Sequence, residues 1–174
     1  MKYRTGELPR VYLNQGDVCF TSEPSLLVTV LGSCVSVTFY YREQKIAAMC
    51  HGFLPCGNCR RNDDTIFRYM NCSLDYIIQR FEQLRIPKQT IETKVFGGAC
   101  MVNGDEASPY MTVGYKNIQK TLEILKRENF KIAAIDTGGQ YGRKIVFNTA
   151  TGDVRLRRLK TKNMPKQKSK KKNV

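Results

Sequence analysis

The sequence predicts an α+β domain, a layered sandwich of stacked mixed or antiparallel β-sheets flanked by helices. Two observations support this class. Segments rich in β-branched and aromatic residues surround two helical segments in the order strands, helix, strand, helix, strands, which is not the strict alternation of a parallel α/β fold. The chain has 174 residues, a length that one domain can use to bury a core without disulfides or metals. We expect a single domain over residues 1–160 and a basic, disordered tail over 161–174.

The first half of the chain carries four or five of the predicted strands. Short apolar runs before residue 25 predict one or two short strands, and residues 25–31 form a further strand that ends at Gly32. The run VSVTFYYREQKIAAMC then reads as two strands joined by the polar break at 41–44, which predicts a β-hairpin with a four-residue loop.

Helical spacing of apolar residues predicts two helices. The first covers residues 69–84, with Pro87 just beyond its end, and the second covers 117–129, with Asn117 as its N-cap. The remaining predicted strands are 92–96, 131–136, 143–148 and 153–159. Glycine-rich GGQYGR at 138–143 does not lead from a strand into a helix, so we interpret it as a tight hairpin turn rather than a phosphate-binding loop.

The predicted hairpin brings a cysteine and a histidine together. His51 is the only histidine of the chain, and a hairpin centred on residues 42–43 places Cys34 directly opposite it. Cross-strand partners have Cβ atoms about 4.5–5.5 Å apart on the same face of a sheet. An imidazole at this distance can take the thiol proton and produce the nucleophilic thiolate.

The residues around Cys34 complete a possible thiol site. Gly32 and Ser33 lead into a sharp turn, where the backbone N–H of Cys34 could face a developing oxyanion. Thr29 could orient the His51 ring through its hydroxyl or its carbonyl. A cysteine in an apolar strand is, however, more often a small buried hydrophobe, so the spacing alone leaves both interpretations open.

The other cysteines predict reduced thiols in a cytoplasmic protein, because seven cysteines follow no secretory signal. Cys56 and Cys59, with Cys50 and Cys72 nearby, have the spacing of half a zinc site. A second such pair is missing, so we predict no metal, and Cys56 and Cys59 are the candidates if one binds. A redox disulfide in this loop is the other alternative.

Charge and hydropathy exclude two classes of partner. Ten of the 29 basic residues lie in 154–174, where there is no acidic residue. This segment has no aromatic residue on which bases could stack, so we interpret it as a solvated tail and expect no nucleic-acid partner. No apolar run approaches the length of about 20 residues that a membrane span requires, so we expect a protein that is not inserted in a membrane.

Five separated motifs then occur in a recognisable order: TVLGSCVSV, MCHGFLP, KVFGGACM, VGYKNIQKTLEIL and DTGGQYGRKIVFNTATGDV. Together they resemble the chemoreceptor glutamine deamidase family, CheD, over about residues 25–156. The resemblance implies a Cys–His–Thr triad at Cys34, His51 and Thr29. It also implies a fold similar to the catalytic domain of cytotoxic necrotizing factor toxins.

The family resemblance implies a protein-glutamine glutaminase without a cofactor. It would hydrolyse glutamine side chains of methyl-accepting chemotaxis receptors to glutamate and ammonia through a thioester on Cys34. Because the substrate is a side chain of a large protein, the thiol is expected in an open cleft. A CheC-type phosphatase is the implied regulatory partner, and a non-catalytic binding module for that phosphatase is the alternative function.

Overall fold

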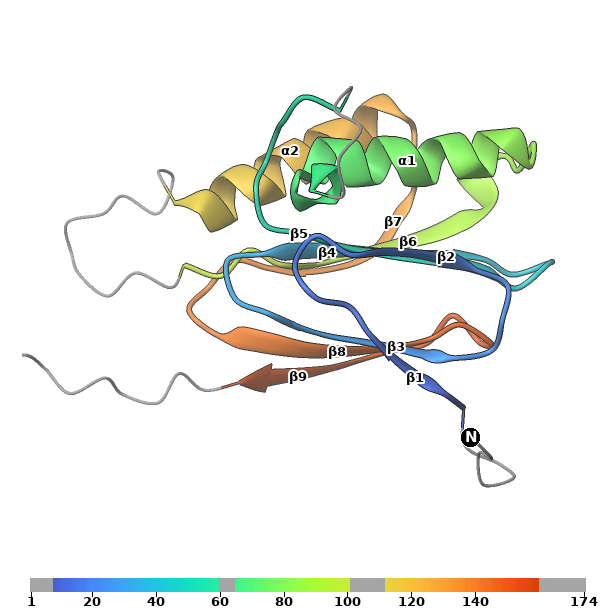
Figure 1. Cartoon of the computed structure of the whole chain (residues 1–174), viewed down its shortest axis with the longest axis horizontal. Helices are drawn as coiled ribbons and strands as arrows, with labels where there is room; N and C mark the ends of the chain where they lie inside the picture. The colour runs from blue at the N-terminus through green and yellow to red at the C-terminus, as the bar shows by residue number, and fades with distance from the viewer. Residues whose placement is uncertain (1–7, 60–64, 101–111, 160–174) are drawn as a thin grey trace, which may run out of the picture.

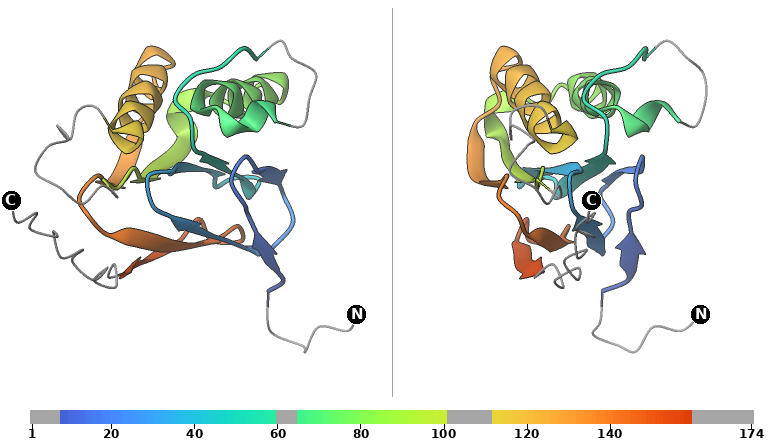
Figure 2. Two further views of the ribbon diagram at one scale, coloured as in Figure 1. Left: turned by 60° about the vertical axis from the view of Figure 1, so that its left-hand side comes forward. Right: turned by 90° about the vertical axis from the view of Figure 1, so that its left-hand side faces the viewer.

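Two stacked β-sheets and a layer of two helices form the protein (Figure 1). The structure is a computed structural model and describes residues 8–59, 65–100 and 112–159. The five-stranded sheet is the middle layer, with the helices on one side of it and the four-stranded sheet on the other (Figures 1 and 2). The predicted α+β class of layered sheets with helices against them is confirmed.

Both sheets are mixed. The four-stranded sheet has the order β1-β3-β8-β9, and the five-stranded sheet has the order β2-β5-β4-β6-β7. The pairs β1–β3 and β6–β7 are parallel and the other pairs are antiparallel. The strands are β1 (Arg10–Tyr12), β2 (Val18–Thr21), β3 (Leu26–Leu31), β4 (Val35–Tyr41), β5 (Ile46–Gly52), β6 (Ile91–Gly97), β7 (Ile132–Thr137), β8 (Gly142–Asn148) and β9 (Val154–Leu159). Every predicted strand is therefore present.

The first helix agrees with its prediction and the second begins earlier than predicted. Helix α1 covers Met70–Gln83 and helix α2 covers Val113–Arg127, and short 3-10 turns lie at Ile66–Arg68 (η1) and Lys88–Thr90 (η2). The hydroxyl of Thr112 caps α2 by accepting a hydrogen bond from the Tyr115 backbone N–H at 3.2 Å. The prediction that Asn117 is the N-cap was wrong, because Thr112 provides the cap and Asn117 is buried within the helix.

The core has two layers, one on each face of the five-stranded sheet. Apolar residues such as Phe39, Phe81 and Leu125 fill the space between this sheet and the helices. Residues such as Leu27, Met49 and Phe147 fill the space between the two sheets. All residues of β4 and β5 are buried, because these strands lie in the middle layer and are covered on both faces.

The β4–β5 hairpin has a different register from the predicted one. Ser36, and not Cys34, lies opposite His51. The loop has four residues, as predicted, but it runs over 42–45 because Tyr41 stays in β4 and is buried. Lys45 adopts a left-handed conformation with φ of 52° to close the turn. The register slips by two residues, so each side chain keeps its predicted face.

The glycine-rich segment after β7 is not a hairpin turn. Strand β7 belongs to the five-stranded sheet and β8 to the four-stranded sheet, so this prediction was wrong. Gly138 and Gly139 have φ of 71° and 66°, and this backbone carries the chain across from one sheet to the other. The link from β3 to β4 makes the same crossing in the opposite direction, and both crossings lie at the left end of the molecule in Figure 1.

The predicted basic tail, residues 161–174, lies outside the described residues. The division of the chain into a domain and a tail therefore stays a prediction. Among the described residues, no helix is both long and apolar enough to span a membrane.

Candidate functional site

The predicted triad residues come from both sheets and from the link between them. Thr29 belongs to β3 of the four-stranded sheet, and His51 belongs to β5 of the five-stranded sheet. Cys34 ends the link that carries the chain from β3 to β4, and it belongs to the group of buried side chains between the sheets. Because Cys34 lies two residues before Ser36, it is on the His51 face of the five-stranded sheet and diagonal to His51.

Thr29 holds the imidazole ring of His51 in a defined state. The Thr29 hydroxyl donates to the Leu13 carbonyl at 2.8 Å, and its oxygen lies 2.8 Å from His51 Nδ1. A hydroxyl has one proton to donate, so Nδ1 carries the proton of the second hydrogen bond. Nδ1 also lies 3.3 Å from the Leu13 carbonyl. In the neutral ring, Nε2 therefore has the free lone pair that a general base requires.

Burial keeps His51 neutral in the resting protein. The ring is 3% exposed, and this desolvation lowers the pKa of His51, while the Leu13 carbonyl and the charge of Asp17 act in the opposite direction. The backbone of the histidine is fixed as well, since its N–H donates to the Asp17 carbonyl at 2.9 Å and its carbonyl accepts from Gly16 N–H at 2.7 Å.

Cys34 is a buried free thiol in contact with a side-chain amide. It is 4% exposed, and Gln15 Nε2 donates a hydrogen bond to its Sγ at 3.5 Å. Burial raises the pKa of Cys34, whereas Gln15 and the backbone N–H of Cys34 itself lower it. The resting pair is thus a neutral thiol and a neutral imidazole. The expected open cleft differs from this arrangement, because Gln15 and the packing between the sheets cover the thiol.

Backbone hydrogen bonds fix the link that bears Cys34. Gly98 N–H donates to the Cys34 carbonyl at 2.7 Å, and Ala99 N–H donates to the Gly32 carbonyl at 2.8 Å. Gly97 makes this close approach possible, because it has φ of 107° and a Cβ there would lie 2.1 Å from the Cys34 carbonyl oxygen. Residues 97–99 therefore hold the link that bears Cys34 in place.

Asn117 joins the cysteine link to the segment that follows His51. Its Nδ2 donates to the Ser33 carbonyl at 3.2 Å and to the Phe53 carbonyl at 3.1 Å. The residue is completely buried, so its position in helix α2 sets the distance between the two chain segments. One side chain of helix α2 thereby bonds to the residue before Cys34 and to the second residue after His51.

Buried polar atoms without a hydrogen-bond partner occur around Cys34 and His51. Within residues 8–59, 65–100 and 112–159, three buried side-chain atoms lack a hydrogen-bond partner: Ser36 Oγ, His51 Nε2 and Asn117 Oδ1. Ser36 lies opposite His51 on the neighbouring strand, and Asn117 holds the residue before Cys34. Such atoms are rare in native proteins and favour a functional site.

The structure thus brings Thr29, Cys34 and His51 into one region, with Gly32 and Ser33 in the link beside it. Sequence reasoning missed Gln15 and assigned Asn117 a different role. Gln15 lies in a polar break between the short apolar runs that precede residue 25, and nothing local connects it to a cysteine 19 positions later. Helical spacing would have placed Asn117 on the buried face of α2 if the helix start had been located at Thr112.

Cys59, one of the two candidate metal ligands, is engaged in a different bond. Cys59 and Cys72 are joined in a disulfide, with Cα atoms 5.2 Å apart. The expectation of reduced thiols throughout was wrong at this pair, because the loop after β5 folds back over α1. Cys50 lies in the core, where burial raises its pKa to about 12, and Cys56 is exposed. Among the described residues, no three cysteine, histidine or acidic side chains lie close enough to hold a metal ion.

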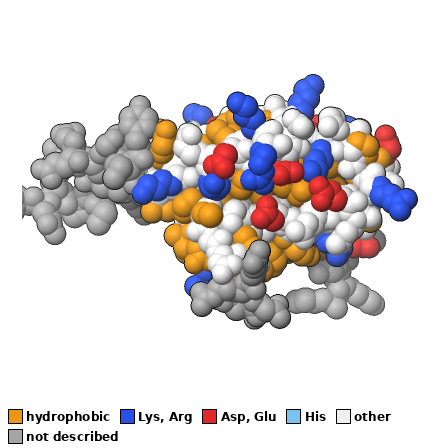
Figure 3. Space-filling view, turned by 90° about the horizontal axis from the view of Figure 1, so that it is seen from above, with side chains coloured by type: hydrophobic (Ala, Val, Ile, Leu, Met, Phe, Trp, Pro, Cys, Tyr) orange, Lys and Arg blue, Asp and Glu red, His pale blue; other side chains and the backbone are white. Residues whose placement is uncertain are grey.

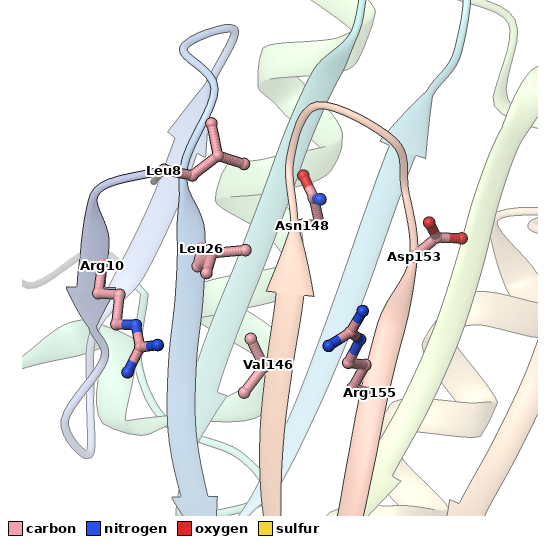
Figure 4. Close-up of a pocket in the computed structure, with 7 residues that line it drawn as sticks. All are labelled: Leu8, Arg10, Leu26, Val146, Asn148, Asp153 and Arg155. Atoms are coloured by element: carbon pink, nitrogen blue, oxygen red, sulfur yellow. The ribbon is translucent and has the colours of Figure 1, made fainter. Parts of the chain in front are cut away.

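Two other surfaces of the described residues have a different character. A pocket on the outer side of the four-stranded sheet contains two arginines and one aspartate but neither Cys34 nor His51 (Figure 4). The face that the helices cover carries intermingled basic and acidic side chains (Figure 3). The described part of the helical face therefore offers no continuous basic surface of the kind that binds nucleic acid.

Fold and geometry together define an α+β protein in which a buried cysteine and a histidine bound to a threonine lie between two sheets. The sequence model of the family described as CheD chemotactic sensory transduction matches residues 53–158. A protein of Geobacter sulfurreducens named "Probable chemoreceptor glutamine deamidase CheD 2" is 38% identical over 159 residues, covering 91% of this chain and 96% of that protein. A protein of Maridesulfovibrio salexigens named "Probable chemoreceptor glutamine deamidase CheD" is 31% identical over 165 residues, covering 91% and 97%. This chain belongs to the CheD family.

Among solved structures, the crystal structure of the Bacillus licheniformis hypothetical protein YfiH is similar to this chain with a TM-score of 0.48 and 9% sequence identity. The match covers 79% of this chain and 62% of the YfiH chain.

Proposed function

We propose that this protein is a cysteine-dependent glutamine deamidase that converts glutamine side chains of chemoreceptors to glutamate and releases ammonia. Its relatives are named as probable chemoreceptor glutamine deamidases over almost the whole chain. The observation that carries the mechanism is the hydrogen bond between Thr29 and His51 Nδ1. It leaves the lone pair of Nε2, which is buried and unpartnered, available for the proton of Cys34.

The first half of the reaction forms a thioester. His51 Nε2 takes the thiol proton, and Cys34 Sγ bonds to the carboxamide carbon of the substrate while the C=O π electrons move onto oxygen. The backbone N–H of Cys34 stabilises this oxyanion. When the oxyanion collapses, the C–N bond breaks, and the nitrogen leaves as ammonia with the proton that His51 returns.

The second half consumes water. His51, neutral again, takes a proton from a water molecule whose oxygen attacks the thioester carbon. The C–S bond then breaks, and the proton goes back to the sulfur of Cys34. The sum is one amide and one water converted to one carboxylic acid and one ammonia, without a cofactor or a redox step.

The burial of Cys34 limits which chemical groups can reach its sulfur. A glutamine side chain is long and ends in a planar amide, so it can reach a thiol that is covered on most sides, whereas the receptor backbone stays outside. The substrate must therefore enter beside the exposed Gln15 side chain, which donates a hydrogen bond to Sγ. The surface around Gln15 is therefore where the receptor docks.

The test is incubation of the purified protein with receptor cytoplasmic fragments, followed by mass spectrometric mapping of glutamine-to-glutamate changes. Cys34→Ala should abolish the changes while circular dichroism and the melting temperature remain those of a folded protein. Cys56→Ala is the matched control, because it removes an exposed free thiol, and it should keep full activity. Activity retained in Cys34→Ala would refute the mechanism.

A CheC-type phosphatase is the regulatory partner that we propose, and a binding module for this phosphatase is the second candidate function. The two candidates separate in one experiment. If the phosphatase binds the wild-type protein tightly while receptor glutamines stay unchanged, the protein acts as a binding module. If receptor glutamines are converted and added phosphatase inhibits the conversion, the deamidase function with this partner is supported.

A further inference from the structure

Gln15 is the described side chain in hydrogen-bond contact with the sulfur of Cys34, and neither its spacing in the sequence nor the family pattern gives it a role. The contact joins Nε2, the amide nitrogen, to Sγ at 3.5 Å. An amide in this orientation presents N–H groups to the sulfur. The geometry is that of a hydrogen-bond donor to a nucleophile.

The turn that carries Gln15 is fixed on both sides of the site. Before it, Leu13 N–H donates to the Val28 carbonyl of β3 at 2.9 Å. After it, Gly16 N–H donates to the carbonyl of His51 at 2.7 Å. The turn is closed by Asn14 N–H, which donates to the Asp17 carboxylate at 2.6 Å. The backbone of Gln15 is therefore held relative to both the histidine and the threonine-bearing strand.

Gly16 permits this tight path. It has φ of 87°, a left-handed conformation that side chains rarely adopt. The exposed Gln15 side chain thus extends from a rigid turn over a buried thiol, and its rotamer is the main freedom that remains.

We propose that Gln15 is a catalytic residue, whose side-chain amide donates a hydrogen bond to the Cys34 thiolate and then to the oxyanion of the tetrahedral intermediate. This inference rests on the proposed deamidase function. The oxyanion is borne by the carbon that bonds to Sγ, so it develops beside the sulfur. The Gln15 amide already donates to this sulfur, and the backbone N–H of Cys34 is the other donor of the proposed oxyanion site. A second donor adds to the stabilisation of the developing charge.

A pseudo-substrate role for Gln15 is chemically possible in a glutamine deamidase, but the orientation disfavours it. Attack by Sγ requires the carbonyl carbon of the amide to face the sulfur, whereas here the nitrogen does. Burial disfavours the thiolate, and the pKa of Cys34 is raised for this reason, with Gln15 acting to lower it. A hydrogen bond from Gln15 to the thiolate therefore offsets part of the desolvation that disfavours the ionised sulfur.

The experiment compares Gln15→Ala, Gln15→Asn and Gln15→Glu with the wild type. The asparagine amide is one methylene shorter and should not reach Sγ, and the glutamate carboxylate cannot donate and repels the thiolate. Gln44→Ala is the matched control, because Gln44 is an exposed glutamine in the loop at the other end of β4. We expect kcat to fall by about 10- to 100-fold in the alanine and asparagine variants and further in the glutamate variant, with a smaller effect on KM.

The second measurement is the rate of Cys34 alkylation by iodoacetamide as a function of pH, followed on the Cys34 peptide by mass spectrometry. Loss of the Gln15 donor should move the apparent pKa of Cys34 upward in Gln15→Ala and more so in Gln15→Glu, with no change in Gln44→Ala. This assay needs no receptor. If the wild type deamidates no receptor glutamine, the proposed function fails, while the alkylation profile still tests the hydrogen bond.

Three results would overturn the inference. The first is an unchanged kcat together with an unchanged alkylation profile in Gln15→Ala. The second is a higher kcat in Gln15→Ala, which identifies Gln15 as an inhibitory cover. The third is conversion of Gln15 itself to glutamate in the wild type but not in Cys34→Ala, which identifies it as an internal substrate.

Discussion

Replacing Thr29 by valine tests whether the threonine hydroxyl orients His51. Valine has nearly the same shape, so the substitution removes the hydroxyl without leaving a cavity. Two hydrogen bonds of 2.8 Å are lost, one to the Leu13 carbonyl and one with His51 Nδ1. At about 0.5–1.5 kcal/mol of net stability for each neutral hydrogen bond, the free energy of unfolding should fall by about 2 kcal/mol. For a domain of this size, that is a decrease of about 4–8 °C in melting temperature.

The catalytic effect of Thr29→Val should be larger than the loss of stability suggests. Without the hydroxyl, His51 Nδ1–H keeps only the longer contact of 3.3 Å to the Leu13 carbonyl, so the ring can turn away from the thiol. General base catalysis is typically worth 10²–10⁴-fold, and because one acceptor remains we expect a loss of about 10- to 100-fold in kcat. Thr29→Ser keeps the hydroxyl and should retain most of the activity.

The assay is the rate of ammonia release with a receptor fragment, together with thermal unfolding followed by circular dichroism. Thr93→Val is the control, since Thr93 is another fully buried strand threonine, whose hydroxyl makes only a long contact of 3.4 Å to the Ile91 carbonyl. It should change the melting temperature slightly and leave kcat unchanged. Wild-type kcat in Thr29→Val would refute the orienting role.

Three further predictions concern the same site. First, kcat should fall as the pH is lowered through the pKa of His51, because only the neutral ring accepts the Cys34 proton. Burial places this pKa below the ordinary value of about 6.5. A pH–rate profile with its acid limb above pH 6.5 would contradict this. The same lowered pKa means that the unfolded chain binds the proton first, so stability should decrease as the pH falls from about 6.5 toward the folded pKa, as denaturant titrations at several pH values can measure. Second, Asn117→Ala should lower the free energy of unfolding by about 1–3 kcal/mol and reduce kcat, because two half-buried backbone carbonyls lose their donor. Wild-type values for both would argue against its positioning role. Third, Gly97→Ala should yield little folded protein, since a Cβ at φ of 107° would lie 2.1 Å from the Cys34 carbonyl oxygen. A melting temperature equal to that of the wild type would refute this.

The hydrophobic pattern of the sequence was sufficient to locate most helices and strands. Val35, Val37 and Phe39 alternate along the first strand of the predicted hairpin, and these side chains lie in the core against the helices. The apolar stripe of α1 likewise predicted its bounds closely. Local patterns succeed here because each residue type reports whether its own position is buried.

The start of α2 shows where local patterns fail. The apolar stripe before Asn117 is short, and the helix begins there because the chain packs closely on the end of β6, where a Cβ on Gly114 would lie 2.7 Å from the Gly98 carbonyl oxygen. The Thr112 hydroxyl then caps the first turn. Contact between distant segments therefore set this boundary, and the sequence signal for it was weak.

The sequence by itself determined which residues are available for chemistry and which face of each strand they occupy. The tertiary structure decided which of them meet. A slip of two residues in the β4–β5 hairpin leaves every side chain on the same face, so the hydrophobic pattern fits equally well with Cys34 or Ser36 opposite His51, and only the backbone of the turn selects between them. The contacts of Cys34 with Gln15 and of Ser33 with Asn117 join residues 19 and 84 positions apart. They arise where the chain crosses between two stacked sheets, and the packing of those sheets is not encoded in any short segment.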